Sequence, residues 1–288
     1  MPFAEFSRII AGMGKAGYLQ PVIGALFLAM IWSLPARAQE RVDVALVLAV
    51  DVSRSMSFEE LRIQREGYAA AIASPEVVRA IGQGGYRRIA ITLFEWANNT
   101  HAREIIGWTI IGGQADADRV AGELMATHSV GQRRTSISGA IDHASGLLQT
   151  APYEADRKVI DISGDGPNNQ GVPVTEARDD AISRGFTING LPMMTRGGVG
   201  SQFHIEDLDR YYAHCVIGGP GAFVVPVNDW DQFAEAVRRK LVLEIGEAAP
   251  AGEPRVIPAQ FVLEEPYDCL IGEKIWQQRG WQFDDLGR

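Results

Sequence analysis

A run of seven apolar residues, Val44–Val50, constrains the fold of this 288-residue chain more than any other feature. Valine, leucine and alanine fill it without a polar interruption, so it predicts a strand buried on both faces. Strands of that kind belong to parallel sheets covered by helices on both sides. Strand-like and helix-like segments alternate after it, and together they predict an α/β fold with a doubly wound, mainly parallel sheet.

The rest of the chain continues this alternation. The expected strands are 44–50, 89–94, 104–111, 158–163, 186–191 and 223–227, and the expected helices are 58–72, 115–127, 137–148, 174–184, 205–213 and 230–245. Only about ten residues separate the second strand from the third, too few for a crossover helix. We therefore expect these two strands to form a hairpin, which gives the sheet one antiparallel edge strand.

The first 38 residues have the composition of an export signal. Arg8 and Lys15 provide a basic start, residues 21–34 form an uncharged apolar run, and Ala36-Arg37-Ala38 has the small-x-small pattern of a cleavage site. This order predicts a signal peptide cleaved after Ala38 and a periplasmic or secreted mature protein. An uncleaved membrane anchor is the alternative. After cleavage, no later run is apolar enough to predict a membrane span.

The C-terminal part differs in composition from the expected domain, 39–247. Residues 248–254 are rich in alanine, proline and glycine and predict a linker, and the remaining residues to 288 are too few for a core of their own. We interpret 248–288 as a linker and a short appendage. In an oxidising compartment, Cys215 and Cys269 are expected to form a disulfide that ties this appendage to the domain. Two separate buried thiols are the alternative.

The charge of the chain argues against one class of partner. The formal net charge is −9, and loss of residues 1–38 removes three basic residues and one acidic residue, which leaves −11. No basic stripe interleaved with aromatic residues is present either, so we expect no nucleic-acid binding.

Three oxygen-bearing side chains follow the first strand at every second position: Asp51, Ser53 and Ser55. Side chains alternate along extended chain, so these three point the same way where the strand leaves the sheet. One carboxylate and two hydroxyls form a hard-oxygen cluster suited to Mg²⁺, and also to Mn²⁺ or Ca²⁺. A serine-rich turn that caps the next helix is the alternative interpretation.

Two later residues are candidates for the same site. Asp165 follows the strand 158–163 inside the turn Ser163-Gly164-Asp165-Gly166, again at the carboxyl end of a strand. Thr135 precedes the helix 137–148, where its hydroxyl can cap the helix or bind a metal. In a mainly parallel sheet these residues are expected at the same edge as Asp51.

With these residues in order, the chain resembles the von Willebrand factor A domain, in particular an exported bacterial subset of that superfamily. The resemblance covers about residues 42–246 and implies a Rossmann-like fold with a metal-ion-dependent adhesion site. It implies that Ser53, Ser55 and Thr135 provide hydroxyl ligands, and that Asp51 and Asp165 bind the metal directly or through water. Ser136 and Ser138 are neighbours that could replace Thr135.

The resemblance also implies how a partner is bound. The metal would keep an open position for an anionic oxygen, so we expect a protein partner that presents an acidic side chain. The family has two glycines before the threonine, whereas this chain has Arg133-Arg134. These two cations either steer an acidic partner or point to solvent.

Enzymatic alternatives find less support in the sequence. No Gly-x-Ser-x-Gly elbow and no glycine-rich phosphate loop with lysine is present, and the five histidines lack a metal-binding spacing. We interpret the histidines as surface or structural residues. We expect a binding module rather than an enzyme. The alternatives are a Mg²⁺-dependent phosphohydrolase using Asp51 and Asp165, and a metal-free interaction scaffold with a degenerate site.

Overall fold

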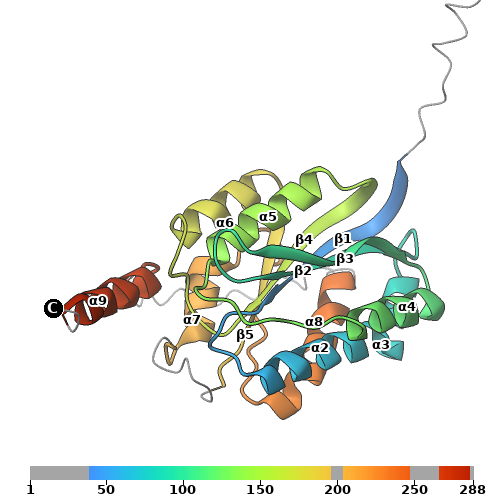
Figure 1. The fold of residues 1–288 in the computed structure, drawn as a ribbon. Helices are drawn as coiled ribbons and strands as arrows, with labels where there is room; N and C mark the ends of the chain where they lie inside the picture. Colours follow the sequence, from blue (N-terminus) through green and yellow to red (C-terminus); the bar gives the residue numbers. More distant parts are fainter. Residues whose placement is uncertain (1–38, 196–203, 247–265, 286–288) are drawn as a thin grey trace, which may run out of the picture. The chain divides into compact units, whose positions relative to one another are not determined.

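The computed structural model describes residues 39–195, 204–246 and 266–285 (Figure 1). The expected signal peptide, 1–38, and linker, 248–254, lie outside the described residues. These two segments, and with them the boundaries of the domain at 39 and 247, therefore stay predictions.

Five strands form one mixed sheet in the order β3-β2-β1-β4-β5. Their bounds are β1, Glu40–Asp51; β2, Ile89–Trp96; β3, Ala102–Ile111; β4, Tyr153–Gly164; and β5, Thr187–Pro192. β1 pairs in parallel with β2 and with β4, and β4 pairs in parallel with β5. β2 and β3 form the antiparallel pair at one edge. The expected α/β class, mainly parallel with one antiparallel edge strand, is confirmed.

Helices cover both faces of this sheet (Figure 1). One layer contains α2, Phe58–Ile72; α3, Pro75–Gly82; α4, Gln114–Met125; and α8, Phe233–Ile245. The other contains α5, Ile137–Gln149; α6, Val174–Ser183; and α7, Leu208–Tyr211, which continues into a π-helical turn, Tyr212–Val216. Alternate residues of β1 contact the two apolar cores, Leu46 and Leu48 on one face and Ala45 and Val47 on the other. This two-sided burial explains the uninterrupted apolar run.

Local signals explain where the helices around β1 begin. The Ser57 hydroxyl accepts a hydrogen bond from the Glu60 amide while the Glu60 carboxylate accepts one from the Ser57 amide, a capping box that starts α2. α3 was not expected. Its start, Ser74-Pro75, is nevertheless a regular N-terminal signal, with serine as the N-cap and proline at the first helical position.

The predicted strand 223–227 is wrong as a strand. These residues lie beside β5 and form isolated bridges, Val224 with Gly190 and Val227 with Met193. The Val225 and Val227 amides donate to the Gly190 and Pro192 carbonyls, but Pro192 has no N–H with which to return a bond, so the ladder is interrupted. The predicted helix 205–213 is also displaced, because the helical residues begin at Leu208 and continue to Val216.

The predicted disulfide is confirmed: Cys215 and Cys269 are bonded, with an S–S distance of 2.01 Å. The bond fixes the segment before α9, Ile271–Asp285, to the π-helical turn.

Among the helices of the described residues, none is both long and apolar enough to cross a membrane.

The strand order reverses at β1. β2 and β3 lie on one side of it, and β4 and β5 lie on the other. In the register of β1 and β4, Val50 is opposite Ser163, so Asp51 and Gly164 leave the sheet together. Open α/β sheets bind ligands at the carboxyl ends of strands at such a switch point. The topology therefore places Asp51 and Asp165 where a ligand is expected.

Candidate metal centre

Asp51 is completely buried at the end of β1 and organises the turn that follows it. One carboxylate oxygen, Oδ1, accepts a hydrogen bond from the Ser53 amide at 2.7 Å, and Oδ2 accepts one from the Ser53 hydroxyl at 3.1 Å. Its backbone carbonyl accepts a bond from the buried Gln64 side chain of α2 at 3.0 Å. The strand end and the first turn of the site are thus held from two sides.

Asp165 completes a cluster of four side chains. Its Oδ1 accepts hydrogen bonds from the Ser55 hydroxyl at 2.8 Å and from the Ser53 hydroxyl at 3.3 Å, and the two hydroxyls lie 2.7 Å apart. The Asp165 amide also lies 3.5 Å from Asp51 Oδ2. The Ser53 hydroxyl therefore lies within hydrogen-bond distance of both carboxylates, whereas the Ser55 hydroxyl contacts Asp165 alone. Four of the five predicted site residues are in hydrogen-bond contact.

Gly164 allows the two strand ends to come this close. A Cβ atom at this position would lie 2.7 Å from the Tyr212 hydroxyl and 3.1 Å from Asp51 Oδ2. Tyr212 is completely buried, and its hydroxyl has no hydrogen-bond partner in the described part of the chain. A larger residue at 164 would have to push either the tyrosine or the carboxylate away.

The cluster carries unfavourable electrostatics. Burial, and then the negative charge of Asp165, raise the pKa of Asp51 well above the usual range of an aspartate. The Nε2 atom of His204 lies 3.4 Å from Asp165 Oδ2. The Asp165 carboxylate raises the pKa of this histidine, against the opposing effect of its own burial. A cation is therefore favoured at the cluster, and His204 can supply one only when it is protonated.

His204 was missed by the sequence analysis. No metal-binding spacing surrounds it, so the sequence predicts only a surface or structural histidine. It reaches Asp165 from 39 positions further along the chain, so no local pattern could have revealed the contact. It also lines a cavity of about 300 Å³ beside Asp165, together with Met194 and Ile205.

Thr135 lies on a third loop, which is fastened to the other two. Gln132 forms a parallel bridge with Ser53. The Thr135 amide donates to the Asn169 side-chain oxygen at 3.0 Å, and the Asn169 amide donates to the Thr135 carbonyl at 2.8 Å. Thr135 is 6% exposed. Within the described residues, no hydrogen bond joins its hydroxyl to the other four predicted site residues. Its part in the site stays a prediction.

The two serines that could replace Thr135 have other partners. The Ser136 hydroxyl caps α5 by accepting from the Gly139 amide at 3.2 Å and donates to the Gln170 carbonyl at 2.9 Å. The Ser138 hydroxyl donates to Asn168 and Gln170. Both hydroxyls fasten the loop after β4 to the start of α5, which leaves Thr135 as the better candidate.

The beginning of the Thr135 loop is held by a buried acid that the sequence analysis did not single out. Glu95, at the end of β2, accepts a hydrogen bond from the Ser129 hydroxyl and lies 3.5 Å from Arg103. Arg65 of α2 also contacts Ser129. Side chains of β2, β3 and α2 therefore position the loop that carries Thr135.

The residues present fit a hard divalent cation. The four clustered side chains offer only oxygen, from two carboxylates and two hydroxyls, and these are ligands that Mg²⁺ and Mn²⁺ accept. In the described parts of the chain, no three histidine, cysteine, aspartate or glutamate side chains gather as they would in a zinc-type site. Any metal held here would depend on the serine hydroxyls.

Residues 41–249 match the protein family described as "Protein of unknown function (DUF1194)". The chain belongs to this family. All five predicted site residues of this DUF1194 protein lie inside the matched range, whereas α9 lies beyond it. A comparison with curated proteins gives no match.

Solved structures with a similar arrangement are distant in sequence. They include the mussel byssus protein PTMP1 "with zinc occupied MIDAS motif", which is 13% identical in sequence. Its TM-score is 0.49, and the match covers 72% of the DUF1194 chain and 48% of PTMP1. The pilus adhesin SpaC of Lactobacillus rhamnosus GG is 13% identical, with a TM-score of 0.48, covering 71% and 30% of the two chains. Manganese-loaded TRAP of Plasmodium vivax is 18% identical, with a TM-score of 0.43, covering 70% and 74%.

This likeness transfers neither a ligand nor a partner. The DUF1194 chain spans about half the length of PTMP1 and about a third of SpaC. All three TM-scores are below 0.5. Any function must therefore be argued from the residues of the chain itself.

Proposed function

We propose that this protein is an exported, metal-dependent binding module of the von Willebrand factor A type. A divalent cation, Mg²⁺ or Mn²⁺, would be held by Asp51, Ser53, Ser55, Thr135 and Asp165. The observation that carries the proposal is the cluster at the switch point of the sheet, where the Ser53 hydroxyl contacts two buried carboxylates and the Ser55 hydroxyl contacts one of them. A cation bound there supplies an open coordination position that favours an anionic oxygen, such as the carboxylate of a partner's aspartate or glutamate.

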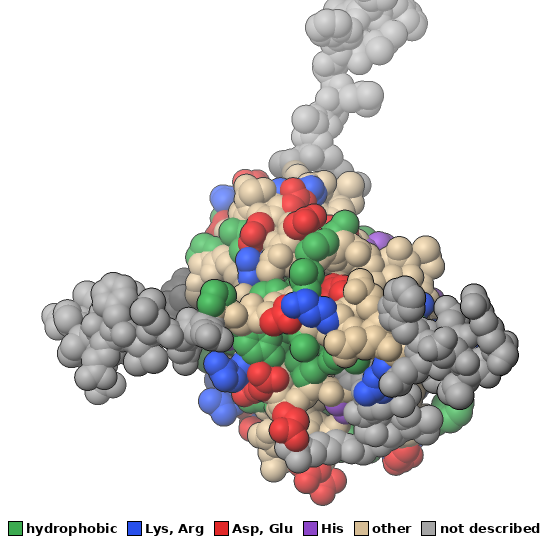
Figure 2. All heavy atoms as spheres, turned by 90° about the vertical axis from the view of Figure 1, so that its left-hand side faces the viewer, with side chains coloured by type: hydrophobic (Ala, Val, Ile, Leu, Met, Phe, Trp, Pro, Cys, Tyr) green, Lys and Arg blue, Asp and Glu red, His purple; other side chains and the backbone are tan. Residues whose placement is uncertain are grey.

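The surface around the cluster suits a protein partner. Phe58, three residues after Ser55, is 83% exposed, and Val130, on the loop that pairs with Ser53, is 58% exposed. An aromatic side chain left in water on the rim of a polar site is typical of an interface anchor. In Figure 2, the side of the molecule that lies on the left in Figure 1 shows hydrophobic side chains exposed among charged ones.

The rim is also basic, although the chain as a whole is acidic. Arg54 and Arg133 are exposed, and Arg54 leans over the neighbouring loop, with its Nε 3.5 Å from the Gly131 carbonyl. Two guanidinium groups beside a cation site complement an acidic segment and would speed its association. This supports the expected acidic partner.

A phosphohydrolase reaction through Asp51 is less well supported. A nucleophilic carboxylate must be ionised and must reach its substrate. Asp51 is fully buried, and Ser53 donates to both of its oxygens. These properties suit a buried metal-supporting group better than an attacking one.

The test is capture of a partner from an envelope extract by the purified protein, with Mg²⁺ or with EDTA. We expect a protein that binds with Mg²⁺, is released by EDTA, and is lost with Ser53→Ala and Asp165→Asn but retained with the exposed control Asp118→Asn. The binding of the purified partner should then depend on one of its own acidic residues. Equal capture in EDTA and by both site variants would favour the metal-free scaffold. Phosphoester turnover abolished by Asp51→Asn would replace the proposal with an enzymatic one.

A further inference from the structure

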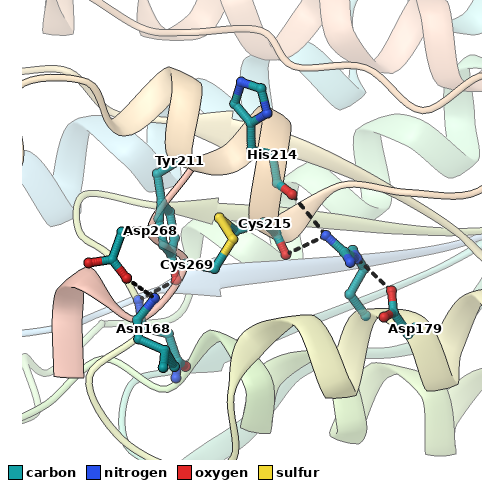
Figure 3. Close-up of a disulfide and its surroundings, with 9 residues drawn as sticks. Asn168, Asp179, Tyr211, His214, Cys215, Asp268 and Cys269 are labelled. Carbon is teal, nitrogen blue, oxygen red and sulfur yellow. Dashed lines mark hydrogen bonds and ion pairs between the residues drawn. A yellow bond between two sulfur atoms is a disulfide. The ribbon is translucent and has the colours of Figure 1, made fainter. Parts of the chain in front are cut away.

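The C-terminal segment before and within α9 makes an unusual set of contacts with the loops of the site. Cys269 is bonded to Cys215, which is completely buried in the π-helical turn (Figure 3). Tyr267 stacks on His214, with the two rings parallel and their centroids 5.6 Å apart. It meets the Tyr211 ring edge-on, with a centroid distance of 6.1 Å. The start of α9 is therefore anchored to the domain by one covalent bond and two aromatic contacts.

Asn168 connects this anchor to the loop that carries Asp165. Its amide donates to the Tyr211 hydroxyl at 3.1 Å, and its side-chain oxygen accepts from the Ser138 amide at 3.0 Å. Its side-chain nitrogen donates to the Val172 carbonyl at 3.2 Å and to Glu273 of α9 at 2.7 Å. Asn168 is completely buried and lies three residues after Asp165. It fixes this loop, and Glu273 completes its set of partners.

α9 also packs closely against the backbone of the loop after β4. A Cβ atom at Gly272 would lie 2.1 Å from the Asn168 carbonyl oxygen. The first turn of α9 therefore rests directly on the backbone of the loop after β4, and only a glycine permits this distance.

α9 also contacts the loop that carries Thr135. The guanidinium carbon of Arg134 lies 3.5 Å from the centre of the Trp276 ring, which is a close cation–π contact. Arg134 has a φ of +77°, in the left-handed region that a residue with a Cβ rarely adopts. Such a backbone persists only when its surroundings hold it there. Trp276 provides part of that support immediately before Thr135.

We infer that α9 is a positioning element of the metal site: Glu273 and Trp276 hold the two loops that carry Asp165 and Thr135, and the Cys215–Cys269 disulfide keeps the helix in place. The inference rests on the proposed function, because it concerns the same site. It extends the site beyond residues 41–249, the range that matches the family. It also implies that the Cys215–Cys269 disulfide affects the affinity of the site for its metal.

The test is the affinity for Mn²⁺ alone, measured by calorimetry on the full chain. Supporting residues behind metal ligands typically change metal affinity about 10-fold or more when they are lost. We expect Glu273→Ala, Trp276→Ala and the pair Cys215→Ser/Cys269→Ser each to weaken binding by about this factor. Glu273→Gln keeps an oxygen that can accept from Asn168, so it should bind within about twofold of the wild type. Lys274→Ala, which removes an exposed ion pair on α9, is the matched control.

The outcomes separate the two proposals. If the wild-type chain binds no Mn²⁺, the proposed function fails. If the wild type binds but Glu273→Ala and Trp276→Ala bind equally well, the role of α9 is refuted while the metal site stands. Thermal unfolding of each variant shows whether it is folded. If the double serine variant is not, the two single substitutions with the disulfide intact decide the matter.

Discussion

Two pairs of buried carboxylates each include an aspartate of β4 or of the turn after it, and they differ in what balances their charge. Asp161, three residues before the end of β4, and Glu244 of α8 are both bound by Lys240, whose ammonium lies 2.7 Å from Asp161. All three are at most 2% exposed. Asp51 and Asp165, at the strand ends, both contact the Ser53 hydroxyl. In the described part of the chain, the basic side chain that reaches this pair is His204, which contacts Asp165.

The comparison shows why only one pair is proposed as a binding site. In the Lys240 cluster, a cation of the chain itself neutralises one of the two charges, and Asn189 donates to Glu244 at 2.9 Å. Lys240 and Asn189 thus join α8 to β4 and β5 around this pair. In the Asp51 cluster the neutral hydroxyls leave the charge to be balanced from outside. The difference lies in the missing cation, not in the acids.

The largest expected effect comes from removing the internal cation. Lys240→Met keeps the approximate volume but leaves Asp161 and Glu244 buried without a counter-ion, and breaking a buried pair in this way costs about 3–5 kcal/mol. Urea unfolding should show this loss, whereas Lys274→Ala, which removes an exposed pair, should change the free energy of unfolding by less than about 1 kcal/mol. A loss of the same small size in both would mean that Lys240 does not balance the cluster.

The second prediction concerns pH. Burial, reinforced by Asp161 and opposed by Lys240, raises the pKa of Glu244 to about 7. The folded state binds a proton on Glu244 more tightly than the unfolded state does, so protonation of Glu244 stabilises the fold. This contribution is fully present below the ordinary pKa of a glutamate and is lost as the pH rises through 7. Glu244→Gln should remove on the order of 2 kcal/mol of this pH dependence between pH 4.5 and 7. Parallel stability curves for the two proteins would contradict the shift.

The third prediction compares the substitution of aspartate by asparagine at Asp51 and at Asp161. In EDTA, Asp51→Asn should leave the free energy of unfolding unchanged or raise it by about 1 kcal/mol, because it removes an unbalanced buried charge. Asp161→Asn should lower it by about 1–3 kcal/mol, since Lys240 then loses a charged partner. The same direction for both substitutions would remove the distinction between the clusters. Thermal and urea unfolding measure both.

The smallest expected effect on stability comes from substituting Phe58, which lies on the surface around the metal site. The Phe58 side chain is 83% exposed, so Phe58→Ala should change the free energy of unfolding by no more than about 0.5 kcal/mol. Once the partner is identified, the same substitution should weaken its binding at least about fivefold, because exposed aromatic anchors carry much of an interface. Unchanged partner affinity would place the interface elsewhere. Met125→Ala, on an exposed apolar residue of α4, is the control.

Local patterns in the sequence were enough to predict the sheet and the central residues of the site. The apolar run before Asp51 and the turn around Asp165 mark strand ends, and strand ends of a parallel sheet meet at one edge. The topology then brought Asp51, Ser53, Ser55 and Asp165 together.

The residues that surround the cluster could not be predicted in this way. His204 and Tyr212 come from segments distant in the sequence, and no local pattern links them to Asp165. Lys240 and Glu244 resemble an ordinary surface pair at i,i+4, and only their burial distinguishes them. The segment 223–227 has the composition of a strand, but it forms only isolated bridges. In each case the deciding factor is a long-range contact.

Calorimetric titration of the protein with Mg²⁺ tests the proposed metal site. We expect one site per chain, absent in Ser53→Ala and Asp165→Asn while both variants remain folded, and retained in Asp118→Asn. Absence of binding by the wild-type protein, or binding that survives both substitutions, would contradict the proposal.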